Sequence, residues 1–122
     1  MTEGINPKDI LGMKKVSMSK VPATAIIQCA RAMMDGARKY GPFNWRKHAV
    51  KAHVYVDAAK RHLDAWFGRE EESKDAKVHH LGHAMACLAI LIDAQETDCL
   101  DDDRPENSAG VSGMLDRYTE ET

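Results

Sequence analysis

Apolar residues recur at three- and four-residue intervals along three stretches of the chain, and this spacing predicts three helices. The first begins at Val21-Pro22, because proline is tolerated in a first helical turn, and ends at Gly41-Pro42. The second runs from about Lys51 to Phe67 and stops at Gly68, and the third runs from about Asp75 to Glu96. The apolar stripes of the first two helices are Ile26, Ile27, Ala30, Met33, Met34 and Ala37, and Val56, Ala59, Leu63 and Phe67.

The third predicted helix is apolar on almost every side between Ala84 and Ile92, which is typical of a buried central helix. Three helices of this kind leave apolar surface that needs a partner. We therefore expect an all-α fold, a small antiparallel bundle of about three main helices that is completed by formation of a dimer or tetramer.

The remaining segments are polar. Residues 1–20 are expected to form an extended lead-in, and residues 69–75 a charged loop. At 122 residues the chain has room for one domain, which we place at residues 1–105. Residues 106–122 are expected to be a flexible acidic tail with a turn near 114–118.

Charge is distributed unevenly along the chain. Residues 96–122 carry nine acidic and two basic side chains, whereas residues 1–95 carry ten acidic and fifteen basic ones. A cationic body suits a small polyanion such as a nucleoside triphosphate, and it also suits plain solubility. The net charge of −2 excludes a strongly basic nucleic-acid binder, so we expect no direct nucleic-acid binding.

The spacing of the cysteines and the length of the apolar runs indicate in which cellular compartment the protein is found. The three cysteines show no C-x-x-C spacing, which disfavours a disulfide framework and a zinc ribbon. The N-terminus shows no signal peptide, and no apolar run approaches the roughly 20 residues of a membrane span. We expect a cytoplasmic protein, in a host cell if the chain is phage-encoded, without a membrane partner.

Three histidines open the third predicted helix, in the sequence His79-His80-Leu81-Gly82-His83. At helical spacing these three rings fall on one face, where two of them can bind one metal ion or one anionic group. A partly exposed polar first turn is the alternative. The preceding carboxylates, Glu70, Glu71, Glu72 and Asp75, are the ligand type that Mg²⁺ and Mn²⁺ prefer, although a charged loop is also often only solvated.

The second helix and the loop before it carry further candidates. Asp57 and Arg61 share a face, either as a simple ion pair or with Asp57 on a metal and Lys60 or Arg61 on phosphate. His62 is either a packing residue or a catalyst. Lys39 stands near the end of the first helix, where cations are stabilising in any case. In the glycine-proline loop that follows it, Phe43, Asn44 and Trp45 offer ring faces and an amide for a base, or a plug for the core.

Several common site motifs are absent from the sequence. It contains no P-loop, no dinucleotide-binding G-x-G-x-x-G and no G-x-S-x-G elbow. His80 stands where an H-E-x-x-H metalloprotease would have glutamate.

Five segments together resemble a known family over about residues 16–105. They read MDGARKYGPFNWR, YVDAAKRHL, GREEE, VHHLGHAMAC and DDRP. This set is similar to the phage dATP/dGTP diphosphohydrolases of the MazZ type, which belong to the MazG-like all-α nucleoside triphosphate pyrophosphatase superfamily. The wider superfamily usually carries E-x-x-E and E-x-x-D on two helices. Here the second helix has no E-x-x-E, and the third-helix position reads from His80 to His83.

The resemblance implies an oligomeric enzyme that hydrolyses dGTP and dATP to monophosphates with Mg²⁺ or Mn²⁺, with two or more ions at each site. In phages of this kind the reaction feeds synthesis of 2-aminoadenine DNA. Because the usual carboxylate motif is absent, we expect the metal ligands to be partly relocated to Glu70, Glu71 and Asp75, with His80 and His83 as further ligands or as phosphate contacts. For the remaining roles we expect Asp57 and His62 to be catalytic, and Lys39, Asn44, Trp45, Lys60 and Arg61 to bind the substrate.

Two alternatives stay open on the sequence. One is a non-catalytic helical module that binds a metal or a nucleotide. The other is a purely structural helical oligomer that uses its acidic tail as an interaction arm.

Overall fold

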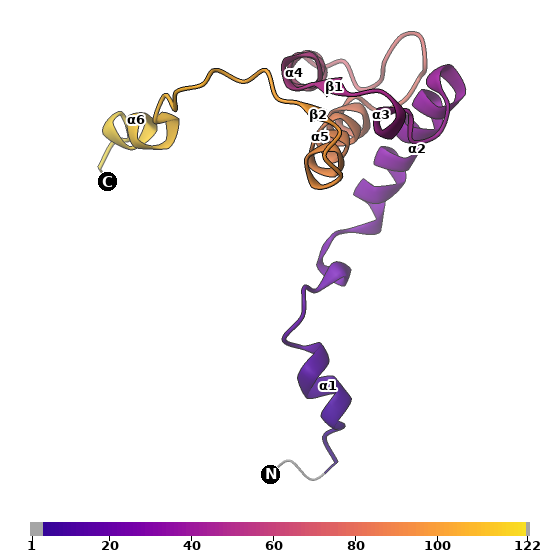
Figure 1. The fold of residues 1–122 in the computed structure, drawn as a ribbon, viewed down its shortest axis with the longest axis vertical. Helices are drawn as coiled ribbons and strands as arrows, with labels where there is room; N and C mark the ends of the chain where they lie inside the picture. The colour runs from indigo at the N-terminus through magenta and orange to yellow at the C-terminus, as the bar shows by residue number, and fades with distance from the viewer. Residues whose placement is uncertain (1–3, 122) are drawn as a thin grey trace.

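The computed structural model describes residues 4–121, and its architecture is all-α, as predicted. Three long helices form the body: α2 (Ala23–Tyr40), α4 (Ala52–Phe67) and α5 (His80–Glu96). Helix α5 packs against both α2 and α4 and is the central helix (Figure 1). The predicted bounds of the first two helices are confirmed to within two residues.

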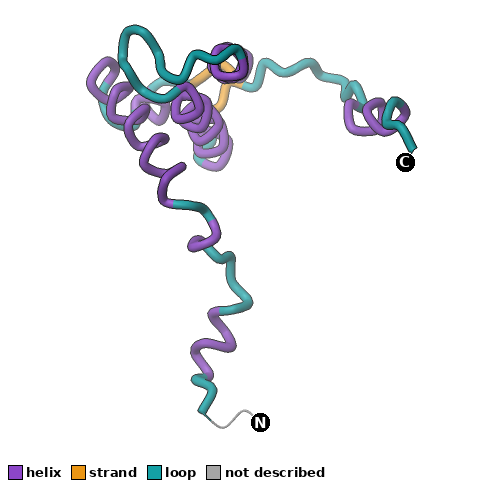
Figure 2. The backbone as a smooth tube through the Cα atoms, turned by 180° about the vertical axis from the view of Figure 1, so that it is seen from behind, coloured by secondary structure: helices purple, strands orange, loops and turns teal. Residues whose placement is uncertain are grey.

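Shorter elements surround the body. They are α1 (Pro7–Gly12), a 3₁₀ turn (Met18–Lys20), α3 (Asn44–Lys47), β1 (Val50–Lys51), β2 (Leu100–Asp101) and α6 (Val111–Arg117). The two-residue strands pair in parallel, with Val50 beside Leu100, and so tie the start of α4 to the chain that follows α5. Helices α1 and α6 stand away from the body on extended segments (Figure 2).

The lead-in and the tail contain more helix than the sequence indicated. The extended conformation predicted for residues 1–20 is wrong over Pro7–Gly12, because the Asn6 side chain accepts from the Lys8 N–H and Pro7 suits a first turn. The region predicted to be a flexible tail with a turn near 114–118 contains α6. Residues 1–3 and 122, which those two predictions also covered, lie outside the described residues.

The predicted start of the third helix is wrong, since α5 begins at His80 rather than near Asp75. The Ser73 N–H donates to the Val78 carbonyl, and Lys77 has a left-handed backbone with φ 55°. These features close a turn instead of continuing a helix. His79 therefore precedes the helix and caps it, because its Nδ1 accepts from the Leu81 N–H at 3.0 Å.

Small side chains fill the centre of the body. The buried apolar residues of the described chain are Ala32, Val50, Ala52, Ala59, Val78, Ala84, Ala86 and Ala94. Alanines allow helices to approach closely but bury little area. Large apolar side chains stay on the surface, among them Phe67, which is 85% exposed, and Ile92, which is 66% exposed. None of the helices in residues 4–121 has the length and hydropathy that a bilayer-spanning segment requires.

Helices α2 and α5 approach each other closely at Gly82 of α5. A Cβ atom at this position would come within 2.4 Å of the Gln28 carbonyl oxygen and 2.8 Å of its carbon, both backbone atoms of α2. Backbone cannot move aside as a flexible side chain can. Glycine is therefore required where α2 and α5 cross.

We predict that Gly82→Ala destabilises the protein by about 1–3 kcal/mol, because the added methyl forces the two helices apart. Gly36→Ala is the matched control, since Gly36 also lies within a helix but a Cβ there would meet nothing within 4 Å. The control should be stabilising by about 0.5–1 kcal/mol through helix propensity. Urea denaturation of both variants measures the difference, and equal effects would contradict the close approach.

Candidate functional site

A cavity of about 450 Å³ opens between α2, α5 and the segment that joins α2 to α3. Aromatic rings form much of its wall, and Asn44 and Asp93 supply polar groups. Its lining residues are Ala32, Met33, Gly36, Ala37, Tyr40, Gly41, Pro42, Phe43, Asn44, Trp45, Tyr55, Ala86, Ala89, Ile90 and Asp93. Such an apolar cavity with a few polar groups is the usual form of a small-molecule site.

Asp93 fixes the aromatic wall to α5. Its carboxylate accepts from the Trp45 indole N–H at 2.7 Å and from two guanidinium nitrogens of Arg46 at 2.7 and 2.8 Å. Hydrogen bonds from Arg46 and Trp45 lower the pKa of Asp93 to about 2. Arg46 in turn lies 5.0 Å from the centre of the Phe43 ring, and Phe43 packs on Trp45. Asp93 thus orients Trp45 of the cavity wall directly and, through Arg46, the ring of Phe43.

The backbone beside this wall adopts left-handed conformations. Gly41 has φ 90° and Phe43 has φ 55°. The first value is favourable only for glycine, and a phenylalanine with positive φ is a strained exception that surrounding contacts must hold. The sharp turn brings Asn44 and Trp45 to the cavity.

Three imidazoles meet where α4 crosses the start of α5. The Nδ1 atoms of His62 and His80 lie 2.8 Å apart, and the His62 ring stacks on the His83 ring at a centroid distance of 4.5 Å. His83 Nε2 lies 3.2 Å from the hydroxyl of the buried Ser73. The sequence analysis grouped His79 with His80 and His83. The structure corrects this, because His79 caps α5 while His62 takes the third place.

The charge state of these rings follows from their packing. Burial, together with His83 and His80 nearby, lowers the pKa of His62 to about 4. Burial likewise lowers the pKa of His83, with Asp35 opposing the shift. Both rings are therefore neutral at pH 7, and a neutral imidazole can accept a hydrogen bond or bind a metal.

The predicted metal ligands do not converge on one point. Glu70 Oε1 lies 3.2 Å from His80 Nε2, a buried nitrogen that has no well-oriented hydrogen-bond partner among the described residues. Glu71 faces His79, with 3.6 Å between Oε2 and Nε2. Asp75 lies 3.5 Å from the Lys39 ammonium. Within residues 4–121, no group of three or more histidine, cysteine or acidic side chains is placed to hold one ion.

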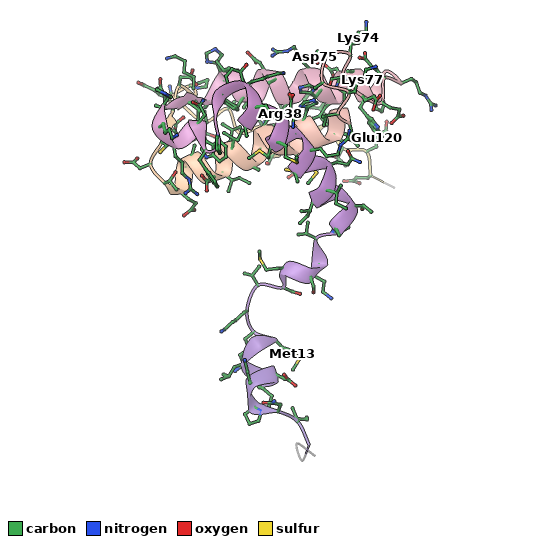
Figure 3. The ribbon with its side chains drawn as sticks, turned by 90° about the vertical axis from the view of Figure 1, so that its right-hand side faces the viewer. Met13, Arg38, Lys74, Asp75, Lys77 and Glu120 are labelled. Carbon is green, nitrogen blue, oxygen red and sulfur yellow. The ribbon has the colours of Figure 1, made fainter. Side chains whose placement is uncertain are left out.

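Lys39 stands between two carboxylates. Its ammonium lies 3.0 Å from Asp35 of the same helix and 3.5 Å from Asp75 of the connector between α4 and α5, and Asp35 is the main cause of its raised pKa. Figure 3 shows Asp75 on the body near Arg38, far from Met13 of the extended N-terminal segment. A protonated lysine at this place is available to a phosphate.

The remaining predicted residues lie on α4. Asp57, Lys60 and Arg61 are exposed, and none of them has an ion-pair partner in the described part of the chain. Of the two alternatives for Asp57 and Arg61, the ion pair is therefore not formed among the described residues. Arg61 is close enough to His62 to contribute to its lowered pKa. Nothing in the geometry brings Asp57 or Lys60 to the imidazole cluster.

One protein-family model matches a stretch of the chain that contains both the aromatic loop and the histidine cluster. Residues 5–104 match the model of a protein family described as "dATP/dGTP diphosphohydrolase, N-terminal". This match covers most of the chain, including every residue of both sites. The chain belongs to the dATP/dGTP diphosphohydrolase N-terminal family.

The chain is similar to a protein of Salmonella phage PMBT28 that is named dATP/dGTP diphosphohydrolase. The two are 27% identical over 103 residues, which is 84% of this chain. The same region is 34% of the relative, so the chain spans about a third of that protein's length. No solved structure matches the chain significantly.

Three residues of the candidate sites, Asp93, Asp35 and Ser73, were not among the residues predicted from the sequence. Asp93 is the lone acidic residue in an otherwise apolar stretch of α5, and that isolation was a usable signal. Asp35 lies one helical turn before Lys39, which suggests a pair. Ser73 stands in a charged loop, and nothing in the sequence marks it as a buried partner of His83.

We predict that the diphosphohydrolase-family domain loses stability as the pH falls from about 6.5 to about 4. Unfolded histidine titrates near 6.5, whereas His62 in the folded chain has a pKa of about 4. The unfolded state therefore binds more protons in this window and is favoured. Partial exposure limits the effect to about 1 kcal/mol.

The variant His62→Phe should flatten this part of the pH profile, because its side chain does not titrate. Thermal melts at pH 7 and pH 4.5, with His48→Phe as the control at an exposed histidine, measure the difference. If the wild-type protein and His62→Phe lost equal stability, the buried neutral state of His62 would be refuted.

Proposed function

We propose that this domain binds a purine deoxynucleoside triphosphate, dGTP or dATP, and hydrolyses it to the monophosphate. The observation that carries the proposal is that α2 and α5 contribute both to the aromatic cavity and to the polar residues beside it. On α2, Lys39 lies between the cavity residues Ala37 and Tyr40, and on α5, His83 lies one turn before the cavity residue Ala86. The family and the name of the phage relative support this substrate class. In a phage the reaction would serve nucleotide metabolism and 2-aminoadenine DNA synthesis.

The cavity suits the base. Its volume of about 450 Å³ lies within the range of ordinary ligand sites. Phe43, Trp45 and Tyr55 present ring faces for stacking, and the Asn44 amide can both donate to and accept from a base edge. Trp45 keeps a fixed orientation because Asp93 holds its indole.

The phosphates would extend from the cavity toward the polar cluster. Ile90 lines the cavity and His83 lies in the cluster, about 10 Å apart along α5 at the helical rise of 1.5 Å per residue. On α2, Lys39 stands close to the cavity residues Ala37 and Tyr40. A phosphate would replace Asp75 on the Lys39 ammonium, and Asp35 would keep that ammonium in place.

We propose one place in the cluster for a divalent ion. Glu70 Oε1 lies 3.2 Å from the buried His80 Nε2, and Mn²⁺ accepts a carboxylate with an imidazole more readily than Mg²⁺ does. We propose that these two residues hold the ion, with phosphate oxygens and water as further ligands. The bound ion would neutralise phosphate charge and lower the pKa of an attacking water.

His62 has a defined task in this arrangement. If His80 binds through Nε2, its Nδ1 carries the proton and donates to the neutral His62 Nδ1 at 2.8 Å. Such an outer hydrogen bond fixes the tautomer and orientation of a ligand histidine. Ser73 fixes His83 in the same way, through the 3.2 Å contact with its Nε2. His62 would thus position His80 and would not itself need to touch the reacting phosphate.

A non-catalytic metal- or nucleotide-binding module is the second candidate. The specific observation in its favour is that no three donor side chains converge within residues 4–121. Such a module would bind a dNTP, with thermal stabilisation, and release it unchanged. We further propose that the domain acts as a homo-oligomer, because apolar side chains such as Ile92 and Phe67 are largely exposed in the single chain.

We predict that the purified protein converts dGTP and dATP to monophosphates in the presence of Mn²⁺ or Mg²⁺. Glu70→Gln should reduce kcat by about 10²-fold or more, because it removes the charged ion ligand. Glu96→Gln, at the other end of α5, is the control. Chromatography of the products with a chelator blank measures turnover. Thermal stabilisation by dGTP without any product would favour the non-catalytic module.

Trp45→Ala is predicted to weaken dNTP binding by about 1–3 kcal/mol, since stacking on one ring has that magnitude. Trp66→Ala is the matched control, because Trp66 lies outside the cavity. Calorimetric titration with dGTP and dTTP gives the affinities. Equal losses in the two tryptophan variants would show that the base binds elsewhere.

A further inference from the structure

Two segments of opposite charge leave the body and make no close packing with it. We define the N-terminal arm as residues 4–21, with α1, and the C-terminal arm as residues 105–121, with α6. Both stand clear of α2, α4 and α5, and they point in different directions (Figures 1 and 2). Neither the aromatic cavity nor the histidine cluster includes any residue of either arm.

The C-terminal arm carries an exposed apolar helix face, and the N-terminal arm exposes apolar side chains, of which Ile10 and Leu11 lie in α1. In α6 the residues Val111, Met114, Leu115 and Tyr118 follow the i, i+3, i+4, i+7 spacing of one helix face, and all are at least 49% exposed. The N-terminal arm exposes a comparable set. It comprises Ile5, Ile10, Leu11, Met13, Val16 and Met18.

The charges of the two arms are complementary. The N-terminal arm has four lysines and one aspartate, a net of +3, and the C-terminal arm has four acidic residues and one arginine, a net of −3. None of these charged side chains forms an ion pair in the part of the chain that the structure describes. The lysines are Lys8, Lys14, Lys15 and Lys20, and the acids are Glu106, Asp116, Glu120 and Glu121.

The two arms leave the body at separate points, the N-terminal arm at α2 and the C-terminal arm after β2. The N-terminal arm continues into the start of α2, an 18-residue helix of the body. The C-terminal arm leaves from β2, which is paired with β1, and Asp103 beyond it binds the His53 backbone N–H at 2.9 Å and the His53 ring. In the described structure these attachments direct the two arms of one copy away from each other, so the arms do not meet within one chain (Figures 1 and 2).

We propose that the N-terminal arm of one copy pairs with the C-terminal arm of a second copy. The lysines of the N-terminal arm face the acidic residues of the C-terminal arm, and the exposed apolar side chains of the two arms cover each other. Because every copy has one arm of each sign, a reciprocal exchange between two copies satisfies all four arms and closes with twofold symmetry. This proposal does not depend on the proposed hydrolase function.

Molar mass from light scattering tests the pairing on the full chain. Raising KCl from about 0.1 M to about 1 M shortens the screening length from about 10 to about 3 Å and should halve the molar mass. The charge-reversed variants Lys14→Glu/Lys15→Glu and Glu120→Lys/Glu121→Lys should each show that halved mass even at low salt. Lys47→Glu/Lys74→Glu, a reversal of two exposed body lysines, should keep the wild-type mass.

Mixing the two arm variants makes the test decisive. Each variant alone has two arms of like sign, but an equimolar mixture has complementary arms between unlike copies and should regain the wild-type mass. Variants that keep the wild-type mass at low salt, or a mixture that stays at half mass, would overturn the proposal. Circular dichroism of each variant checks that the body is folded.

Discussion

The crossing of α2 and α5 at Gly82 is the constraint on which the rest of the structure depends. A Cβ there would lie 2.4 Å from the Gln28 carbonyl oxygen, so the two backbones meet without an intervening side chain. The contact fixes how closely the two helices approach at this point. Lys39 of α2 contacts Asp75 ahead of α5, and Trp45 of the aromatic loop binds Asp93 near the end of α5. Both candidate sites include residues of these two helices, so a change in the spacing of α2 and α5 would affect both.

Small residues along the crossing have two consequences. Ala32 and Ala86 let the helices lie close, and the same short side chains leave the space that becomes the cavity. A core of alanines buries little apolar area, so large apolar side chains such as Phe67 and Ile92 stay exposed on the body. The cavity and the exposed apolar surface thus follow from the same small residues.

Electrostatics divide the site into a neutral part and a charged part. Burial keeps His62 and His83 neutral, whereas Asp35 keeps Lys39 protonated. A polyanion would be attracted by the Lys39 ammonium, whereas a metal ion would bind only a neutral imidazole. The turn at Ser73 separates the two roles, since it directs Glu70 to His80 and Asp75 to Lys39. A longer α5, as the sequence suggested, would have moved Asp75 onto the helix and removed this division.

The sequence by itself determined the all-α class, the bounds of α2 and α4 and the family, because these depend on local periodicity, on proline and glycine, and on short motifs. It also marked His80, His83, Asn44 and Trp45 as residues of interest. Only the tertiary structure decided that His62 joins the imidazoles in place of His79, and that Asp93 holds Trp45. Those contacts join residues far apart in the chain, and their distances follow from how closely α5 packs against its neighbours, which helical periodicity does not encode.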